Sequence, residues 1–160
     1  MKSIHSFDLV DYLKTHSIFK GMSDDQAQTL ASAASIRTYE PGDCLFKQDE
    51  SADFCYIVVS GRVSVQIPAI YGPPLVVQSI PDEGVLGWSW LIPPYRWAFE
   101  AITQVQTEVI ELDGKALREA CETDPVLGYQ LMKRFAGLMS QRLYEAREKM
   151  MENWSAPGFA

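Results

Sequence analysis

The sequence predicts a mainly β domain, an antiparallel sandwich or small barrel, with helices flanking it along the chain. Three observations predict this fold class. Between Ile36 and Leu112, short apolar runs are separated by turn signals roughly every 8–12 residues, the spacing of an antiparallel sandwich or barrel. A capped helical pattern precedes this region, and a long helical pattern follows it. The 160 residues are enough to bury one core without disulfides or metal.

Two short helices are expected before the strands. The first spans Phe7–Lys14 and carries apolar residues on one side. The second begins with a capping box, in which Ser23 is the N-cap and Gln26 is the third helical residue, and it runs to about Ala34. Both helices are expected to pack on the core.

The strands follow from runs of apolar residues between turns. Pro41-Gly42-Asp43 is a turn signal. The run Phe54–Val59 fits a strand that is buried on both faces, and Ser60-Gly61 is expected to form a two-residue hairpin turn after it. Val63, Val65 and Ile67 alternate with polar residues, which predicts a half-exposed strand. Further strands are expected at 44–47, 75–80 and 107–112.

A long helix is expected after the strands. Asp124 is a suitable N-cap and Pro125 suits the first helical position, so the helix would run to about Met151. Two interpretations of its apolar stripe stay open: the whole stripe packs on the barrel, or its distal half contacts the same helix of a second copy. The stripe consists of Leu131, Phe135, Leu138, Met139, Leu143, Ala146 and Met150.

These elements divide the chain into one domain and a tail. The domain is expected over residues 1–152, with helices in 7–35, the β-barrel in 36–112 and the C-terminal helices in 114–152. The tail 153–160 contains a proline and a glycine and is expected to be disordered.

Composition and charge exclude several classes of protein. The net charge of −7 argues against nucleic-acid binding, which needs clustered Lys and Arg. No stretch approaches the ~20 apolar residues of a membrane span, so no membrane association is expected. The N-terminus does not resemble a secretory signal, and the three cysteines form no CxxC pair. A cytoplasmic protein with reduced thiols is therefore expected.

The chain shows no catalytic apparatus. Its two histidines, His5 and His16, both precede the strands, so no imidazole is available in the barrel for a metal site or a general base. No GxSxG, GxGxxG or P-loop pattern is present. A barrel enzyme is therefore the least favoured interpretation, and we expect no catalytic residue and no metal.

The segment GWSWLIPPYRWAF, Gly87 to Phe99, is the strongest candidate for a binding site. It holds three of the four tryptophans around one arginine, Arg96, which is expected at the start of a strand. Gly84 and Gly87 bracket a tight turn. A turn whose N–H groups face a buried arginine can hold a phosphate, because the planar guanidinium donates two hydrogen bonds. Taken alone, the pattern is more often that of a surface arginine in an ion pair.

The order of elements resembles the cyclic nucleotide-binding domain family from about Phe7 to Met151. The resemblance rests on the runs YEPGD, FKQ, SADFCYIV and SGRV, and on Leu112 and the Asp124-Pro125 helix. It implies an eight-stranded jelly roll, also called a double-stranded β-helix, flanked by helices. The family's transcription factors carry a DNA-binding domain after the long helix, and none is expected in this chain.

The family's phosphate cassette has a Gly-Glu pair and, about ten residues later, Arg followed by a small residue and Ala. Gly87, Arg96 and Ala98 match this pattern. Trp88 stands at the glutamate position, where the family's carboxylate accepts a ribose hydroxyl, and an indole has no acceptor. Trp97 replaces the small residue. Each lost partner would cost about 1–3 kcal/mol of binding free energy.

When Arg142-Leu143 is aligned with the family's C-terminal helix, Ala146 and Arg147 stand where the family places residues that reach the purine. In the turn at 48–53, Asp49 stands where the family usually has a glycine before an acidic residue.

The resemblance implies a stand-alone regulatory module, not an enzyme. Its ligand would be a cyclic nucleotide, cAMP or cGMP, or another anionic small molecule, and the signal would pass through the C-terminal helix to a homodimer or protein partner. The alternative is an interaction or scaffold module whose tryptophans fill a vestigial pocket that binds no nucleotide. The expected ligand-binding residues are Gly87, Trp88, Ser89, Arg96, Trp97 and Ala98.

Overall fold

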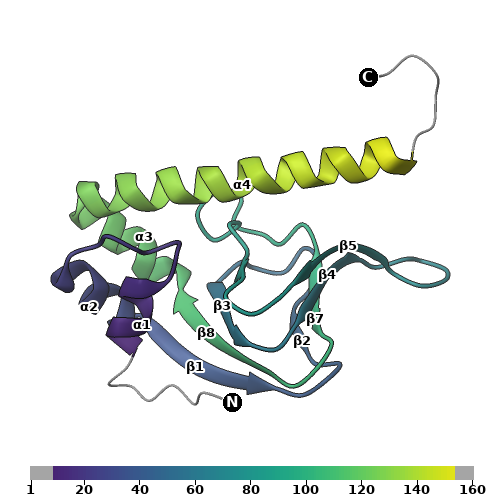
Figure 1. Cartoon of the computed structure of the whole chain (residues 1–160), viewed down its shortest axis with the longest axis horizontal. Helices are drawn as coiled ribbons and strands as arrows, with labels where there is room; N and C mark the ends of the chain where they lie inside the picture. The colour runs from purple at the N-terminus through teal and green to yellow at the C-terminus, as the bar shows by residue number, and fades with distance from the viewer. Residues whose placement is uncertain (1–8, 154–160) are drawn as a thin grey trace.

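The computed structural model describes residues 9–153. Two antiparallel four-stranded sheets lie beneath a long C-terminal helix, and two N-terminal helices and α3 lie at one end (Figure 1). The mainly β fold with flanking helices is therefore confirmed. In chain order, the elements are α1 Leu9–Thr15, α2 Asp24–Ser32, β1 Ala34–Tyr39, β2 Cys44–Phe46, β3 Phe54–Ser60, β4 Val63–Ile67, β5 Leu75–Ile80, β6 Val85–Leu86, β7 Glu100–Thr103, β8 Thr107–Asp113, α3 Gly114–Thr123 and α4 Pro125–Asn153.

The sheets have the strand orders β1-β8-β3-β6 and β2-β7-β4-β5. Consecutive strands β3 and β4 thus lie in different sheets, and the hairpin predicted at Ser60-Gly61 is wrong. The chain turns there from one sheet into the other. Gly61 has a φ of +111°, and a Cβ at this position would lie 2.8 Å from the carbonyl oxygen of Gln106. Glycine therefore lets the crossing segment pass close to the loop before β8.

Strand burial follows the expected pattern in β3 but not in β4. Residues 55–58 of β3 are all buried, as expected for a strand covered on both faces. In β4, Ser64 is also buried, while Ile67 at the strand's end is exposed. The predicted alternation is wrong at these two positions: the short Ser64 side chain donates to Gln66 Oε1, and Ile67 lies where β4 leads into an exposed loop.

The N-terminal helices are close to their predicted places. The described part of α1 begins at Leu9, and Leu9 and Leu13 are buried. The capping box of α2 is present: Ser23 Oγ accepts from the Gln26 amide, and Gln26 Oε1 accepts from the Ser23 amide, each at 3.1 Å. The helix ends at Ser32 instead of about Ala34, and β1 begins at Ala34, inside the range assigned to helices.

We expect Ser23→Ala to lower the free energy of unfolding by about 1 kcal/mol, because the substitution removes the acceptor of the Gln26 amide. Urea denaturation followed by circular dichroism measures the change. Ser32→Ala is the matched control, since Ser32 is exposed at the other end of the same helix. A loss in the control as large as that in Ser23→Ala would contradict the capping argument.

The helix α4 begins as predicted. Asp124 Oδ1 accepts from the amides of Val126 and Leu127 at 3.1 Å, which satisfies the first turn. Burial along the helix is uneven: Phe135 is fully buried, whereas Leu143 is 73% exposed and Met150 is 69% exposed. The interpretation that the whole stripe packs on the barrel is therefore wrong, and contact of the distal half with a second copy stays a prediction. Residues 154–160 of the predicted tail lie outside the described residues.

Two clusters of buried side chains make up the core. One joins the N-terminal helices, α3 and α4 to one face of the β1-β8-β3-β6 sheet, and it contains Trp90. The other lies between the two sheets and contains Phe46 and Trp97. The tryptophans of GWSWLIPPYRWAF are thus divided between the two clusters.

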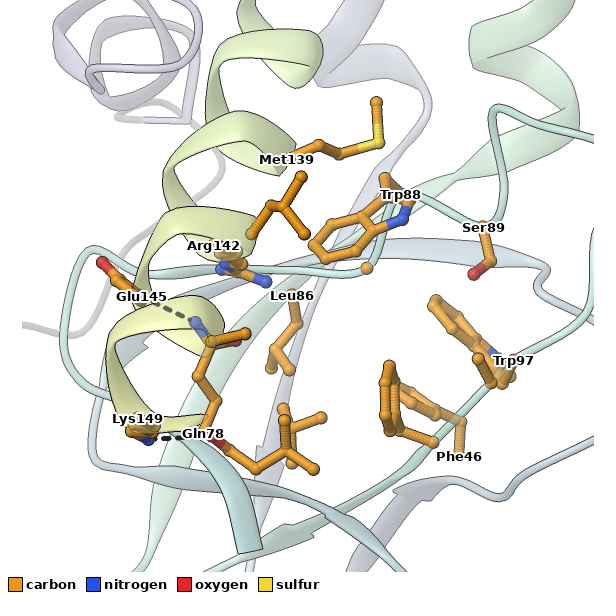
Figure 2. A pocket seen from close by; sticks show the side chains of 17 residues that line it. Phe46, Gln78, Leu86, Trp88, Ser89, Trp97, Met139, Arg142, Glu145 and Lys149 are labelled. Atoms are coloured by element: carbon orange, nitrogen blue, oxygen red, sulfur yellow. Dashed lines mark hydrogen bonds between the residues drawn. The ribbon is translucent and has the colours of Figure 1, made fainter. Parts of the chain in front are cut away.

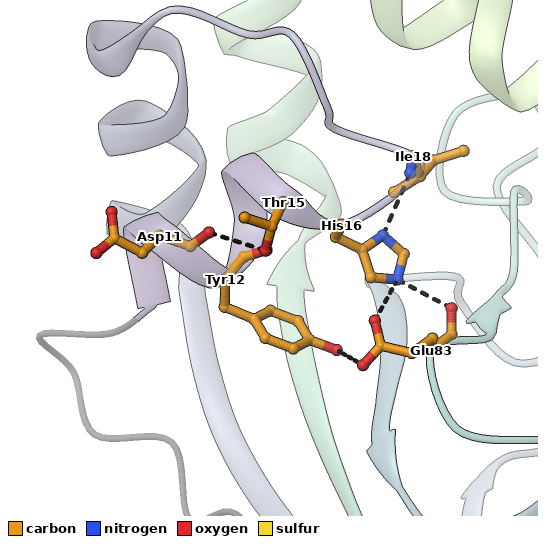
Figure 3. A network of polar contacts seen from close by, with 6 residues as sticks. All are labelled: Asp11, Tyr12, Thr15, His16, Ile18 and Glu83. Atoms are coloured by element: carbon orange, nitrogen blue, oxygen red, sulfur yellow. Dashed lines mark hydrogen bonds and ion pairs between the residues drawn. The ribbon is translucent and has the colours of Figure 1, made fainter.

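A polar network joins the N-terminal helices to the turn before β6 (Figure 3). The Tyr12 hydroxyl donates to Glu83 Oε1 at 3.2 Å, and His16 Nε2 lies 2.9 Å from the Glu83 carbonyl oxygen. The Ile18 amide donates to His16 Nδ1, so Nε2 is the nitrogen that carries a proton and donates to Glu83. Glu83 itself has a φ of +63°. Helix α1 and its following loop therefore hold a strained turn two residues before β6.

Candidate functional site

A cavity of about 290 Å³ lies between the barrel and α4. Figure 2 shows the Trp88 ring on one side of it and the stacked rings of Phe46 and Trp97 on the other. The residues 139–149 of α4 close it from above. Five of its lining residues are polar, and the others are apolar or glycine. The polar ones are Gln78, Ser89, Arg142, Glu145 and Lys149.

Trp97 forms one wall of the cavity. Its ring is buried and stacks on Phe46, with 3.8 Å between centroids and 13° between planes. It also lies against the backbone of Gly87, because a Cβ at Gly87 would overlap the ring atoms Cη2 and Cζ3. Gly87 has a φ of +83°, so glycine is needed here both for conformation and for space.

The turn after β6 forms the next wall. Residues Trp88 to Leu91 make a turn closed by a 2.9 Å bond from the Leu91 amide to the Trp88 carbonyl. Within residues 9–153, no oxygen accepts a hydrogen bond from the backbone N–H of Gly87 or Ser89. Backbone donors therefore remain available beside the cavity.

Arg96 does not reach the cavity, and the expectation of a buried arginine is wrong. Its side chain is exposed, and Nη1 donates to the carbonyl oxygen of Asp49 at 2.7 Å. Nor does it start a strand, since β7 begins at Glu100; it forms an isolated bridge with Ser51.

Arg96 and Trp97 form a short extended stretch beside residues 50–51: the Asp49 amide donates to the Trp97 carbonyl, and the Trp97 amide donates to the Glu50 carbonyl. Tyr95, which precedes this stretch, has a φ of +55°. Successive side chains of extended chains point to opposite sides. Trp97 takes the inner side, so Arg96 points outward. Asp49, which replaces the usual glycine, has a φ of +67°, a conformation that aspartate tolerates better than most residues.

The arginine that lines the cavity is Arg142, on α4. Its guanidinium carbon lies 5.3 Å from the centroid of the Trp88 ring, and Nη2 donates to the carbonyl oxygen of Val85 in β6. Burial lowers the pKa of Arg142, and the nearby charge of Glu145 opposes this change. The guanidinium remains charged, because even a lowered arginine pKa stays above physiological pH.

Two more polar contacts fasten α4 to strand β5. Gln78 Nε2 donates to Glu145 Oε2 at 3.0 Å, and Lys149 Nζ donates to the Val77 carbonyl at 2.9 Å (Figure 2). Gln141 Nε2 donates to the other oxygen of Glu145, also at 3.0 Å. Each carboxylate oxygen of Glu145 therefore accepts one hydrogen bond from a glutamine side chain.

The structure brings together five of the six predicted ligand-binding residues. The residues that line the cavity are Gly87, Trp88, Ser89, Trp97 and Ala98, and the one that does not is Arg96. Ala146 lines the cavity as the alignment implies, whereas Arg147 is exposed outside it. Whether a ligand binds there stays a prediction.

Sequence reasoning missed Arg142, Glu145 and Lys149 as lining residues. A signal was present in the spacing: Met139, Arg142, Ala146 and Lys149 recur at three or four residues, which is one face of a helix.

We also searched the described residues for a metal site, a reactive cysteine and a membrane-spanning helix. Across residues 9–153, no group of three or more His, Cys, Asp or Glu could hold a metal ion. Burial raises the pKa of the Cys55 thiol to about 12, which makes this cysteine a poor nucleophile. No helix within the same residues is long and apolar enough to cross a membrane.

Together, the two four-stranded sheets, the glycine turn after β6 and the cavity beneath the C-terminal helix define a jelly-roll domain with a cavity beside its long helix. A family profile described as the cyclic nucleotide-binding domain matches residues 36–124, and the chain belongs to this family. Domains of this family are typically regulatory and not catalytic.

Similar proteins include a channel, a bacterial protein and a kinase subunit. The potassium channel AKT2 of Oryza sativa is 25% identical over 134 residues, which cover 84% of this chain and only 16% of the channel. A candidate cyclic nucleotide-binding protein from Geobacter metallireducens is 26% identical, with a TM-score of 0.76 over 83% of this chain and 96% of that one. The regulatory domain of Toxoplasma gondii PKA, solved with cAMP, is 23% identical, with a TM-score of 0.68 over 88% of this chain and 50% of that one.

Proposed function

We propose that this chain is a regulatory module that binds a small anionic ligand in the cavity between the Gly87 turn and α4, and that it signals through α4. The observation that carries this proposal is that the cavity's walls come from both the barrel and the helix. A ligand that touches both has a different affinity for each position of the helix. It therefore shifts the population toward the position it binds better.

The chemistry of the walls supports an anionic ligand. The free amides of the Gly87 turn and the guanidinium of Arg142 are donors beside the cavity, and the side chains of Gln78, Ser89 and Lys149 add further donors to its lining. The aromatic rings of Trp88 and Trp97 offer flat surfaces for a base or another ring. A cyclic nucleotide, cAMP or cGMP, is the family's ligand and the first to be tested.

The exposed half of α4 is the proposed output. Leu143, Tyr144 and Met150 are large apolar side chains that are more than half exposed. Leu143 also lines the cavity, and all three residues belong to the helix that closes it, so a change in helix position alters the surface they form. A second copy of the chain or another protein is the proposed partner of that surface.

Thermal denaturation with cAMP or cGMP tests ligand binding. At a nucleotide concentration ten times the dissociation constant, we expect a stabilisation of about 1.4 kcal/mol, which raises the melting temperature by about 3–6 °C. Hydrogen exchange is expected to change in residues 139–150 of α4, which shows that the helix responds. A ligand that stabilises the barrel without any change in α4 would contradict the proposed signalling.

The alternative, a scaffold module with a filled pocket, is favoured by one observation. At position 97 the family's motif has a small residue, and this chain has a tryptophan. Its ring fills the space directly over Gly87. In that case the tryptophan emission would be protected from quenchers and unaffected by any small anion. Emission that shifts on addition of a ligand would contradict the alternative.

A further inference from the structure

The Arg142 side chain is a charged group on an apolar wall without a carboxylate partner. The ion pairs formed within residues 9–153 join Lys14 to Asp24 and Arg37 to Glu111, and neither of them includes Arg142. A partly buried cation is stabilised when an anion pairs with it, and otherwise it carries the cost of lost hydration.

Glu145 is close enough to influence Arg142 but does not pair with it. Its two carboxylate oxygens accept from Gln78 and Gln141, one each. The lowered pKa of Arg142 agrees with the absence of such a pair, because the effect of burial on this pKa is larger than the opposing effect of the Glu145 charge. The cavity therefore contains an arginine whose partner is a neutral carbonyl, that of Val85, and an aromatic ring, that of Trp88.

The shape of the cavity suits a flat ligand. Figure 2 shows the Arg142 guanidinium at one end, beside Trp88, with the Phe46–Trp97 stack across the open space. A ring that lies against the stack can direct a short acidic group toward Arg142. The apolar surroundings favour a ligand with few hydroxyl groups, because each buried hydroxyl needs a partner.

We propose that Arg142 is the anion-binding residue of this cavity, and that its ligand is a planar aromatic carboxylate. The proposal rests on the function proposed above, since it assigns the anion and the ring within the same cavity. The planar guanidinium pairs with a carboxylate through two parallel hydrogen bonds. Because Arg142 lies on α4, the ligand's charge acts directly on the helix that moves.

A cyclic nucleotide fits these walls less well. Arg96 faces solvent on the other side of the 95–97 segment, so it offers no cation to a phosphate inside the cavity. Trp88 has no acceptor for a ribose hydroxyl, and each oxygen of Glu145 already accepts one hydrogen bond, from Gln78 or from Gln141. A ligand with a carboxylate and an aromatic ring requires neither the Arg96 cation nor an acceptor for a ribose hydroxyl.

Isothermal titration with four probes tests the ligand class: benzoate, indole-3-acetate, the neutral amide indole-3-acetamide, and cAMP. We expect indole-3-acetate to bind at least tenfold more tightly than indole-3-acetamide and than cAMP, with benzoate between them. Binding of cAMP with no binding of either carboxylate would overturn this proposal and leave the proposed function standing. No binding of any probe would overturn both.

Variants of three arginines test whether Arg142 is the residue that binds the anion. Arg142→Gln is expected to weaken indole-3-acetate binding at least tenfold, and Arg142→Lys to restore part of it. Arg96→Gln and Arg147→Gln are matched controls, because both side chains are exposed and outside the cavity, and both should bind like the unmodified chain. Loss of binding in Arg96→Gln with retention in Arg142→Gln would overturn the assignment.

Melting temperatures of the free variants separate a direct role of Arg142 from a structural one. Arg142 also donates to the Val85 carbonyl, so its replacement is expected to lower the melting temperature somewhat. The affinities of Arg142→Lys and Arg142→Gln for indole-3-acetate are then compared at a temperature well below the melting temperatures of both variants. Equal affinity of these two variants for indole-3-acetate would overturn a role in binding the charge.

Discussion

Trp90→Ala is expected to lower the free energy of unfolding by about 3–5 kcal/mol, which lowers the melting temperature by about 6–20 °C. The Trp90 side chain is fully buried and meets the Phe135 ring edge-on, with 5.3 Å between centroids. Its backbone carbonyl also accepts from Arg118 Nη1 at 2.5 Å. Removing the indole leaves a large void where α4 meets the barrel. Chemical denaturation of the purified variant measures the loss.

Trp88→Ala is the matched control, because Trp88 belongs to the same turn but lines the cavity and is only half-buried. We expect a smaller loss, about 1–2 kcal/mol. A loss in Trp88→Ala that equals or exceeds the loss in Trp90→Ala would contradict the assignment of Trp90 to the core and Trp88 to the cavity.

Gly87→Ala is expected to cost about 2–5 kcal/mol of unfolding free energy. Two effects contribute: alanine is strained at a φ of +83°, and its Cβ overlaps the Trp97 ring. The ring must then move toward the cavity, so the tryptophan emission is also expected to change. Denaturation curves and emission spectra of the variant measure both effects.

Gly42→Ala isolates the effect of strain. Gly42 has a φ of +89°, close to that of Gly87, but no atom lies within 4 Å of the position its Cβ would take. About 1–2 kcal/mol is expected from strain alone, with no change in emission. Equal losses in the two variants would mean that Trp97 does not press on Gly87.

The fold was predictable because its signals are local. The capping box at Ser23, the Asp124-Pro125 start of α4 and the apolar runs of β3 and β5 each depend on a few adjacent residues. The pairing of strands is not local. The turn at Ser60-Gly61 has the composition of a hairpin, but the chain crosses there to the second sheet because β8 and β6 already occupy both edges of β3.

The candidate site was predictable as a segment but not in its orientation. The sequence places Arg96 and Trp97 next to each other, and only one of them can face inward in an extended chain. The tryptophan has the larger apolar surface to bury, and it finds Phe46 to stack on, so the arginine is turned out. No local pattern reveals this choice, since Phe46 is far away in the sequence.

The same reason explains why Arg142 was missed. Its contacts with Val85 and Trp88 join segments more than fifty residues apart, and they exist only once α4 has packed on the barrel. The helical spacing that places Arg142 beside Met139 and Ala146 was visible, but not the surface that this helix face would meet.

The network of Tyr12, His16 and Glu83 bears on how this domain can be divided. The matched family segment, residues 36–124, includes Glu83 but neither of the side chains that hold it, and it also excludes the α4 wall of the cavity. The smallest autonomous unit that retains the cavity is therefore longer at both ends than the recognisable motif. A fragment limited to residues 36–124 would carry the family signature without the α4 wall of the cavity.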